Sequence, residues 1–198
     1  MWQLPADEAP LARAWQAATP FPHLVIDDLV AVAELPALLE ILDEEGVEPY
    51  SGDLFAFDAT APEPKTAELR AVRAAFGAAL AGPLSRITGK PVARADLRAY
   101  AYRVGHYLLP HSDHQEGLER LLAFAYYLPT PEPPRGGELE LYRCTVGPDG
   151  EYAATESALV IEARPNRLVV FDVSDVSLHQ VREVLGGLRL SLAGWFYA

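Results

Sequence analysis

The chain has 198 residues, half of them apolar, which is enough for one domain with a sizeable core. Its formal net charge of −12 and its scarcity of lysine, limited to Lys65 and Lys90, argue against nucleic acid as a partner, since phosphate backbones are bound by clustered basic residues. Cys144 is the only cysteine, no apolar run could cross a bilayer, and residues 1–20 lack a signal-peptide pattern, so we expect a cytoplasmic protein with no membrane partner.

The first hundred residues are expected to form a short strand and supporting helices. Residues 21–28 are an apolar run that ends in two aspartates, which predicts a strand followed by acids able to cap the next helix. Leucines recur at helical spacing over 35–42, and apolar residues do so again over 69–80. Gly82-Pro83 is expected to break or kink this second helix.

From residue 97 onward the pattern changes to short apolar runs separated by Pro/Gly turn chemistry, which is typical of strands. The predicted strands are 97–104, 107–113, 120–128, 137–143, 157–162, 167–173, 178–185 and 188–197. Eight short strands suit a jelly roll. We therefore predict a single domain over 1–198, mainly β with flanking α-helices, in which 1–96 supply a strand and helices packed on one sheet and 97–198 form the jelly-roll core.

Three residues have the chemistry of a metal site. His111 and Asp113 lie two apart in a predicted strand, so alternation would project both to the same face. His179 follows the buried-looking run 168–171. Two imidazoles and one carboxylate form the facial triad that leaves coordination positions open on Fe(II). Each part alone also fits a structural role, as a hydrogen-bonded surface pair or a core histidine, so the hypothesis depends on all three together.

Arg189 interrupts a leucine-rich strand and shares its face with Ser191 and Ala193, away from the leucines. A buried arginine requires an anion, and Glu138 or Glu183 could supply one as a structural salt bridge. The small Ala193 and the hydrogen-bonding Ser191 favour instead an external carboxylate, such as that of a small dicarboxylate.

The glycine pair at 186–187 decides whether His179 and Arg189 can face the same side of one hairpin. A three-residue loop over 185–187, with residue 184 paired to 188, would place them on one face. A two-residue Gly-Gly turn with continuous pairing would place His179 on the opposite face. The site hypothesis therefore predicts the longer loop.

Several segments carry a family pattern between residues 21 and 197. They are Tyr102-x-x-Gly105-x-x-Leu108-x-x-His111-x-Asp113, Ala125-Tyr126-Tyr127-Leu128, Gly136-Gly137-Glu138-Leu139, Asn166-Arg167-Leu168-Val169-Val170-Phe171 and Arg189-Leu190-Ser191-Leu192-x-Gly194-Trp195-Phe196. Jointly these motifs resemble the iron(II)/2-oxoglutarate-dependent dioxygenases of the prolyl 4-hydroxylase-like superfamily. The resemblance implies a double-stranded β-helix, the cupin-like form of the jelly roll.

The same resemblance implies roles for six residues. Fe(II) would bind His111, Asp113 and His179, while Arg189 and Tyr127 would hold the distal carboxylate of 2-oxoglutarate and Tyr102 would line its pocket. Tyr126 and Tyr127 face opposite sides of their strand, so only one can reach the pocket, and we favour Tyr127. Some prolyl hydroxylases have lysine in place of Arg189, but a guanidinium can also bind a carboxylate, with two parallel hydrogen bonds.

The implied activity is hydroxylation of an unactivated C–H bond with O2, releasing succinate and CO2, with ascorbate as a possible reductant. The expected substrate is a prolyl or other amino-acid side chain, free or within a peptide or protein. Residues 55–63 and 130–135 are candidate substrate loops. Two other classes stay open, a cupin-like metal protein without oxygenase turnover and a silent regulatory domain, because fold does not fix function. The sequence does not predict an oligomeric state.

Overall fold

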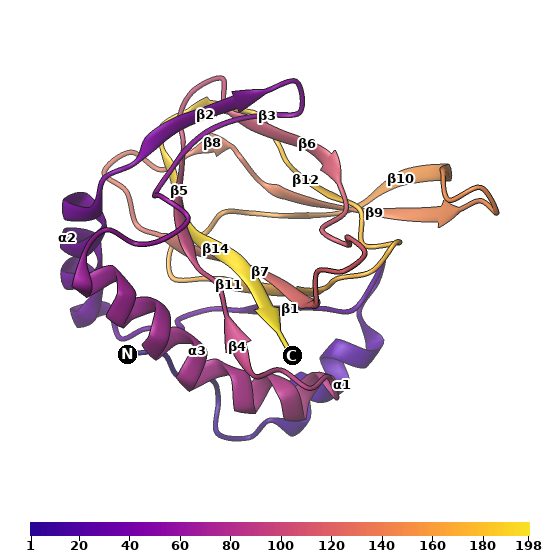
Figure 1. Cartoon of the computed structure of the whole chain (residues 1–198), viewed down its shortest axis with the longest axis horizontal. Coiled ribbons are helices and arrows are strands. Elements are labelled where there is room, and N and C mark those ends of the chain that lie inside the picture. Colours follow the sequence, from indigo (N-terminus) through magenta and orange to yellow (C-terminus); the bar gives the residue numbers. More distant parts are fainter.

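The computed structural model describes residues 1–198. Most of its strands belong to one curled antiparallel sheet (Figure 1). Its helices are α1 (Ala9–Ala17), η1 (Val32–Glu34), α2 (Leu35–Glu45) and α3 (Ala67–Thr88). The first strands are β1 (His23–Ile26), β2 (Glu48–Gly52), β3 (Phe55–Ala59), β4 (Arg94–Ala95), β5 (Arg98–Tyr102), β6 (Tyr107–His111) and β7 (Arg120–Leu128). They are followed by β8 (Arg135–Gly136), β9 (Leu139–Val146), β10 (Tyr152–Ile161), β11 (Leu168–Asp172), β12 (His179–Val181), β13 (Val184–Gly186) and β14 (Arg189–Tyr197).

The sheet folds over on itself, so that two halves face each other. One half has the order β1-β11-β7-β14-β5, and the other has the order β6-β12-β9-β10. Strand β3 joins them, because Asp58 and Ala59 pair with β5 whereas Phe55 and Ala56 pair with β6. The arrangement is the predicted double-stranded β-helix. In Figure 1 the β9–β10 hairpin projects from the body of the molecule.

The helices cover the outer face of the first half of the sheet (Figure 1) and form the larger hydrophobic core with it. Helix α3 runs to Thr88 with Pro83 inside it, so of the two predicted effects of Gly82-Pro83 the break does not occur, and the kink stays a prediction. Leu84 and Ile87 follow the proline and are buried in this core. Burying two such side chains contributes about 1.5–3 kcal/mol each, which offsets the cost of about 3 kcal/mol for proline inside a helix. None of the helices combines the length and hydropathy needed for a membrane crossing.

Two further expectations for the N-terminal half are corrected, the aspartate cap at 27–28 and the loop at 55–63. Asp28 does not cap a helix: it has a positive φ of 57°, and the residue that precedes α2 is Glu34, which makes no side-chain cap bond. Asp27 instead accepts hydrogen bonds from the Arg167 guanidinium. Residues 55–59 form strand β3 rather than a loop, because alternate aromatic side chains stack against the neighbouring strands.

The connection around Gly186-Gly187 is also different from prediction. Neither hairpin forms, because β13 pairs with β8 and β12 pairs with β6 and β9, while β14 lies in the other half of the sheet. The glycines serve close approach to the preceding loop: a Cβ on Gly187, whose φ is +67°, would overlap the carbonyl oxygen of Pro133. His179 and Arg189 therefore face one cavity from the two halves of the sheet and not from one hairpin.

Candidate metal and cosubstrate site

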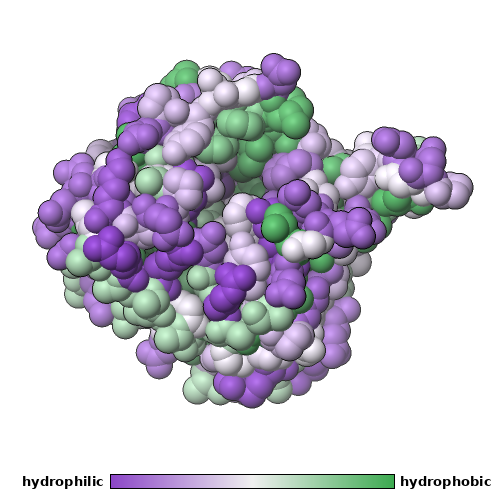
Figure 2. Space-filling view, in the orientation of Figure 1, coloured by the Kyte–Doolittle hydropathy of each residue, from purple (hydrophilic) through white to green (hydrophobic).

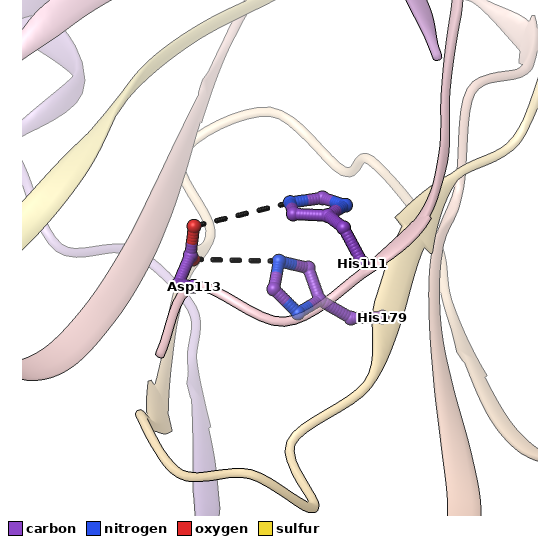
Figure 3. A group of neighbouring side chains, drawn as sticks. All are labelled: His111, Asp113 and His179. Carbon is purple, nitrogen blue, oxygen red and sulfur yellow. Dashed lines mark ion pairs between the residues drawn. The ribbon is translucent and has the colours of Figure 1, made fainter. Parts of the chain in front are cut away.

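His111, Asp113 and His179 lie together between the two halves of the sheet. Their potential ligand atoms are all within 4.8 Å of one another. His111 Nε2 lies 3.9 Å from Asp113 Oδ1, and His179 Nε2 lies 3.5 Å from Asp113 Oδ2. Both imidazole rings point toward the carboxylate (Figure 3). Two imidazole nitrogens and one carboxylate oxygen suit Fe(II), so this donor set fits the metal that the resemblance implies.

The local backbone that supplies these ligands differs from the predicted alternation. Strand β6 ends at His111, and Asp113 lies in the loop that follows. A bulge between β6 and β12 lets Leu108 and His111, three residues apart, both line the cavity. His111 pairs directly with His179 across the two strands, which places the rings 4.3 Å apart. The three side chains lie together as predicted. A bulge in the β6–β12 pairing and the loop at Asp113 bring them together, and not the predicted alternation within one strand.

Backbone carbonyls set the orientation of both histidines. His111 Nδ1 donates to the Leu109 carbonyl and His179 Nδ1 donates to the Ser177 carbonyl, each over 2.9 Å. Since a carbonyl can only accept, each Nδ1 carries a proton, and in the neutral ring the free lone pair is then on Nε2. That lone pair is directed at the group of ligands. The hydrogen bonds thus prepare both rings for metal binding.

His179 is the most buried of the three ligands, with only 6% of its side chain exposed. Burial lowers the pKa of His179 well below its usual value, and the neighbouring His111 lowers it further. The imidazole is therefore neutral at pH 7. A neutral ring is the form that binds a metal ion.

Arg189 lies elsewhere in the same cavity, on β14, and is 3% exposed. Its only side-chain hydrogen bond runs from Nη1 to the Ser191 hydroxyl, over 3.3 Å, and its Nε has no partner. Neither Glu138 nor Glu183 pairs with it, so the structural salt bridge considered above is absent. The structure therefore holds a buried cation that has no protein counter-ion, which fits an external carboxylate.

Two tyrosines surround this guanidinium. The ring centroids of Tyr102 and Tyr127 lie 4.7 Å and 4.9 Å from its carbon atom. The Tyr127 hydroxyl is buried without a hydrogen-bond partner. Burial raises the pKa of Tyr102, so the Tyr102 phenol is neutral and can donate a hydrogen bond to an anion. Tyr126 points the other way, toward Asn166 and the helices. The structure thus places Tyr102, Tyr127 and Ser191 around Arg189.

The cavity between the ligands and Arg189 has a volume of about 230 Å³. In the space-filling view, apolar surface gathers around a hollow below the β2–β3 hairpin (Figure 2). Aromatic side chains make up much of the lining: Phe55, Phe57, Tyr100, Tyr102, Phe124, Phe171 and Trp195. The Trp195 indole nitrogen is buried and has no partner. The cavity is therefore an apolar chamber with a few directed polar groups.

Sequence reasoning missed Tyr100 and included Phe57 only as part of the candidate substrate segment 55–63. Both residues face the cavity and make an edge-to-face contact with ring centroids 5.2 Å apart. The available signal was the spacing of two between Phe55 and Phe57 on β3 and between Tyr100 and Tyr102 on β5. Residues two apart share one face of a strand. Residues 130–135, a predicted substrate loop, do not line this cavity. They lie instead against the 186–188 connection.

Comparison with known proteins gives consistent results. The family model of the 2OG-Fe(II) oxygenase superfamily matches residues 97–197. The prolyl 3-hydroxylase OGFOD1 of Xenopus laevis is 35% identical over 91% of this chain and 35% of that protein. The corresponding Mus musculus protein is 32% identical over 94% of this chain and 37% of that protein. The chain thus spans about a third of the length of these curated relatives.

A solved structure shows the same architecture. The Pseudomonas putida prolyl-4-hydroxylase matches with a TM-score of 0.68 and 20% sequence identity, covering 94% of this chain and 98% of that chain. At this identity the match shows a shared fold. The double-stranded β-helix expected from the sequence is therefore confirmed both by the strand order and by this likeness.

Proposed function

This chain belongs to the 2OG-Fe(II) oxygenase superfamily, and from that premise we propose that it hydroxylates a prolyl residue in a peptide or protein. Its cofactors are Fe(II) and 2-oxoglutarate, with O2 as the oxidant. The single observation that best supports the proposal is the joint presence of an open His-Asp-His ligand set and a buried, unpaired arginine in one cavity.

The residues would bind the cofactors as follows. His111, Asp113 and His179 would hold the metal through one face and leave its other positions free. Arg189 would bind the distal carboxylate of 2-oxoglutarate, because its Nε has no other partner. The Tyr127 hydroxyl, also without a partner, would complete the binding of that carboxylate.

When bound, Fe(II) supplies the chemistry that couples oxidative decarboxylation of 2-oxoglutarate to hydroxylation of a C–H bond, with succinate and CO2 as products. The protein contributes position and environment. Phe57, Tyr100 and Trp195 give an apolar, partly enclosed chamber, which limits water near the reacting C–H bond. The bonds from His111 and His179 to backbone carbonyls keep both rings in the binding tautomer.

The prolyl substrate is proposed from two supports. The relatives that match this chain over most of its length are named prolyl 3-hydroxylases. The aromatic lining from Phe55 to Trp195 suits a compact, apolar ring, which would pack on aromatic faces without leaving buried polar groups unpaired. A peptide or protein carries such a ring in the form of proline.

The test is a turnover assay with Fe(II), 2-oxoglutarate, O2 and short peptides that each contain one proline in a different sequence context. We expect succinate, together with peptides that gain one oxygen atom on the proline, detected by fragmentation mass spectrometry. Matched peptides with alanine in place of proline should gain none. Absence of succinate with every peptide would overturn the dioxygenase assignment, and oxygen found only on residues other than proline would overturn the prolyl substrate.

The ligand variant His111→Ala should form neither product, because it leaves the metal one imidazole short. His114→Ala is the matched control: this histidine lies next to Asp113, but its Nε2 pairs with Asp175 over 3.2 Å and its side chain is 47% exposed. Full turnover by His111→Ala would remove the metal site from the proposal.

A further inference from the structure

Asp113 is the one predicted ligand that no strand holds. Strand β6 ends two residues before it, and the residues after it, 114–119, are all exposed up to the start of β7 at Arg120. A side chain on such a connection lacks the restraint of a sheet ladder. The orientation of the carboxylate must therefore be set by other contacts.

Two side chains bind the backbone around this ligand. The Ser112 hydroxyl donates to the Ser174 carbonyl over 2.9 Å, which ties the segment to the loop before His179. On the other side, Arg120 Nη1 donates to the carbonyl of Asp113 itself, over 3.2 Å. Arg120 is thus the residue that contacts the backbone of the ligand directly.

Arg120 is in turn held by β14. Its guanidinium carbon lies 3.6 Å from the ring centroid of Trp195, in a close cation–π stack. Trp195 lines the cavity, and Arg120 starts β7 in register with Tyr197. One side chain therefore connects the loop that carries a metal ligand to the strand that carries Arg189.

The position of Arg120 has no other explanation in the structure. The guanidinium makes no ion pair, and its Nε is buried without a hydrogen-bond partner. A buried unpaired donor costs free energy, so solvation does not favour this arrangement. The stack on Trp195 and the bond to the Asp113 carbonyl are the two interactions that do.

We propose that Arg120, supported by Trp195, is a positioning residue that holds Asp113 in the orientation needed for metal binding. The inference rests on the proposed function, because it assumes that Asp113 is a metal ligand. Arg120 acts through the backbone of Asp113 and does not itself touch metal or substrate. Its loss should weaken metal binding, while Arg189 and its surroundings keep their structure.

The test is a titration with Mn(II) alone, in which free Mn(II) is followed by electron paramagnetic resonance and no turnover occurs. Arg120→Met keeps the apolar stem on Trp195 but removes the donor, and we expect its Mn(II) affinity to fall about tenfold. Arg120→Lys should recover part of that loss, because an ammonium can still donate to the Asp113 carbonyl. Trp195→Leu removes the stacking partner and should also weaken Mn(II) binding.

Arg94→Met is the matched control. The guanidinium carbon of Arg94 lies 3.9 Å from the ring centroid of Tyr197, which is on β14 like Trp195, but Arg94 contacts none of the three predicted metal ligands. Its Mn(II) affinity should equal that of the wild type, and melting temperatures should show that every variant is folded. Wild-type Mn(II) affinity in both Arg120→Met and Trp195→Leu would overturn the inference, as would an equal loss in Arg94→Met. A wild-type protein that binds no Mn(II) would overturn the proposed function, and this inference with it.

Discussion

Arg189 carries a buried positive charge for which the protein supplies no counter-ion. Its strand neighbours Leu190 and Leu192 face the helices, so the arginine faces the cavity by simple alternation. Tyr102 and Tyr127 enclose it without neutralising it. An uncompensated buried cation is costly, so the residue is best explained by a ligand that completes it.

Arg189→Ala should raise the 2-oxoglutarate concentration needed for half-maximal turnover at least about 30-fold, which corresponds to about 2 kcal/mol. Mn(II) affinity should stay close to wild type, because Arg189 does not belong to the ligand group. Arg189→Lys should lose less, since an ammonium still binds a carboxylate. Turnover assays at varied 2-oxoglutarate concentration measure the first quantity, and isothermal titration with Mn(II) measures the second. An unchanged 2-oxoglutarate requirement in Arg189→Ala would exclude this role for Arg189.

Strand parity predicted some residue orientations correctly and failed for one. Tyr127 faces Arg189 and Tyr126 faces the helices, as alternation requires. Asp113 shares a cavity with His111, but it does so from a loop. Alternation applies only inside a regular ladder, and the sequence does not show where β6 ends.

At the scale of elements, a charged network joins β9 to β12 and to Arg182, the residue that follows β12. These strands position His179. Glu140 is 3% exposed and accepts two hydrogen bonds from Arg182 and one from Gln180. The bonds from Arg182 are the main reason that the pKa of Glu140 falls to about 2. The carboxylate therefore stabilises this part of the sheet in its ionised form.

Glu140→Gln should lower the free energy of unfolding by about 2 kcal/mol at pH 7, measured by urea denaturation. Because folding lowers the pKa of Glu140, its carboxylate stabilises the folded state fully at pH values above about 4.5, the pKa in the unfolded chain. This stabilisation is lost as the pH falls from about 4.5 toward 2. The difference between wild type and variant should therefore shrink over this range. Glu156→Gln is the control, because its ion pair with Arg143 is exposed and should be worth less than about 1 kcal/mol. A difference that is constant with pH would contradict the assignment.

Gly137 connects β8 to β9 and lies against Arg189, at the end of the cavity where we propose that 2-oxoglutarate binds. A Cβ there would approach Val184 Cγ2 at 2.9 Å and Arg189 Cδ at 3.0 Å, with φ at +73°. Gly137→Ala should therefore displace Arg189 and weaken 2-oxoglutarate binding several-fold. Gly150→Ala has a similar φ of +83° but open space around the Cβ, so it should cost stability only. Equal cosubstrate affinities in the two variants, measured by titration, would rule out the contact.

At the scale of the whole molecule, the site exists only because the sheet folds over on itself. His111 and His179 come from one half of the sheet, and Arg189 comes from the other half. Strand β3 joins the halves and also supplies Phe55 and Phe57 to the cavity. Ligands that contact both halves should therefore stabilise the complete fold.

Mn(II) and 2-oxoglutarate together should raise the melting temperature of the wild type. Ligand at a hundredfold excess over its dissociation constant adds about 2.7 kcal/mol, which for a domain of this size is roughly 5–10 °C. Asp113→Ala should lose most of this shift, because it removes the carboxylate that joins the two histidines. Differential scanning calorimetry gives the result, and an equal shift in both proteins would show that the ligands bind elsewhere.

The amino-acid sequence by itself determined the residue types of the site, the strand-rich second half and the face of Arg189, since these depend on local pattern and motif. The tertiary structure decided what depends on distant contacts. The packing of Leu84 and Ile87 outweighed the proline in α3. The connection at 186–187 leads to the other half of the sheet and packs closely against residues 132–133. Long-range pairing of this kind leaves no periodic signal in the chain, because the partners lie tens of residues apart.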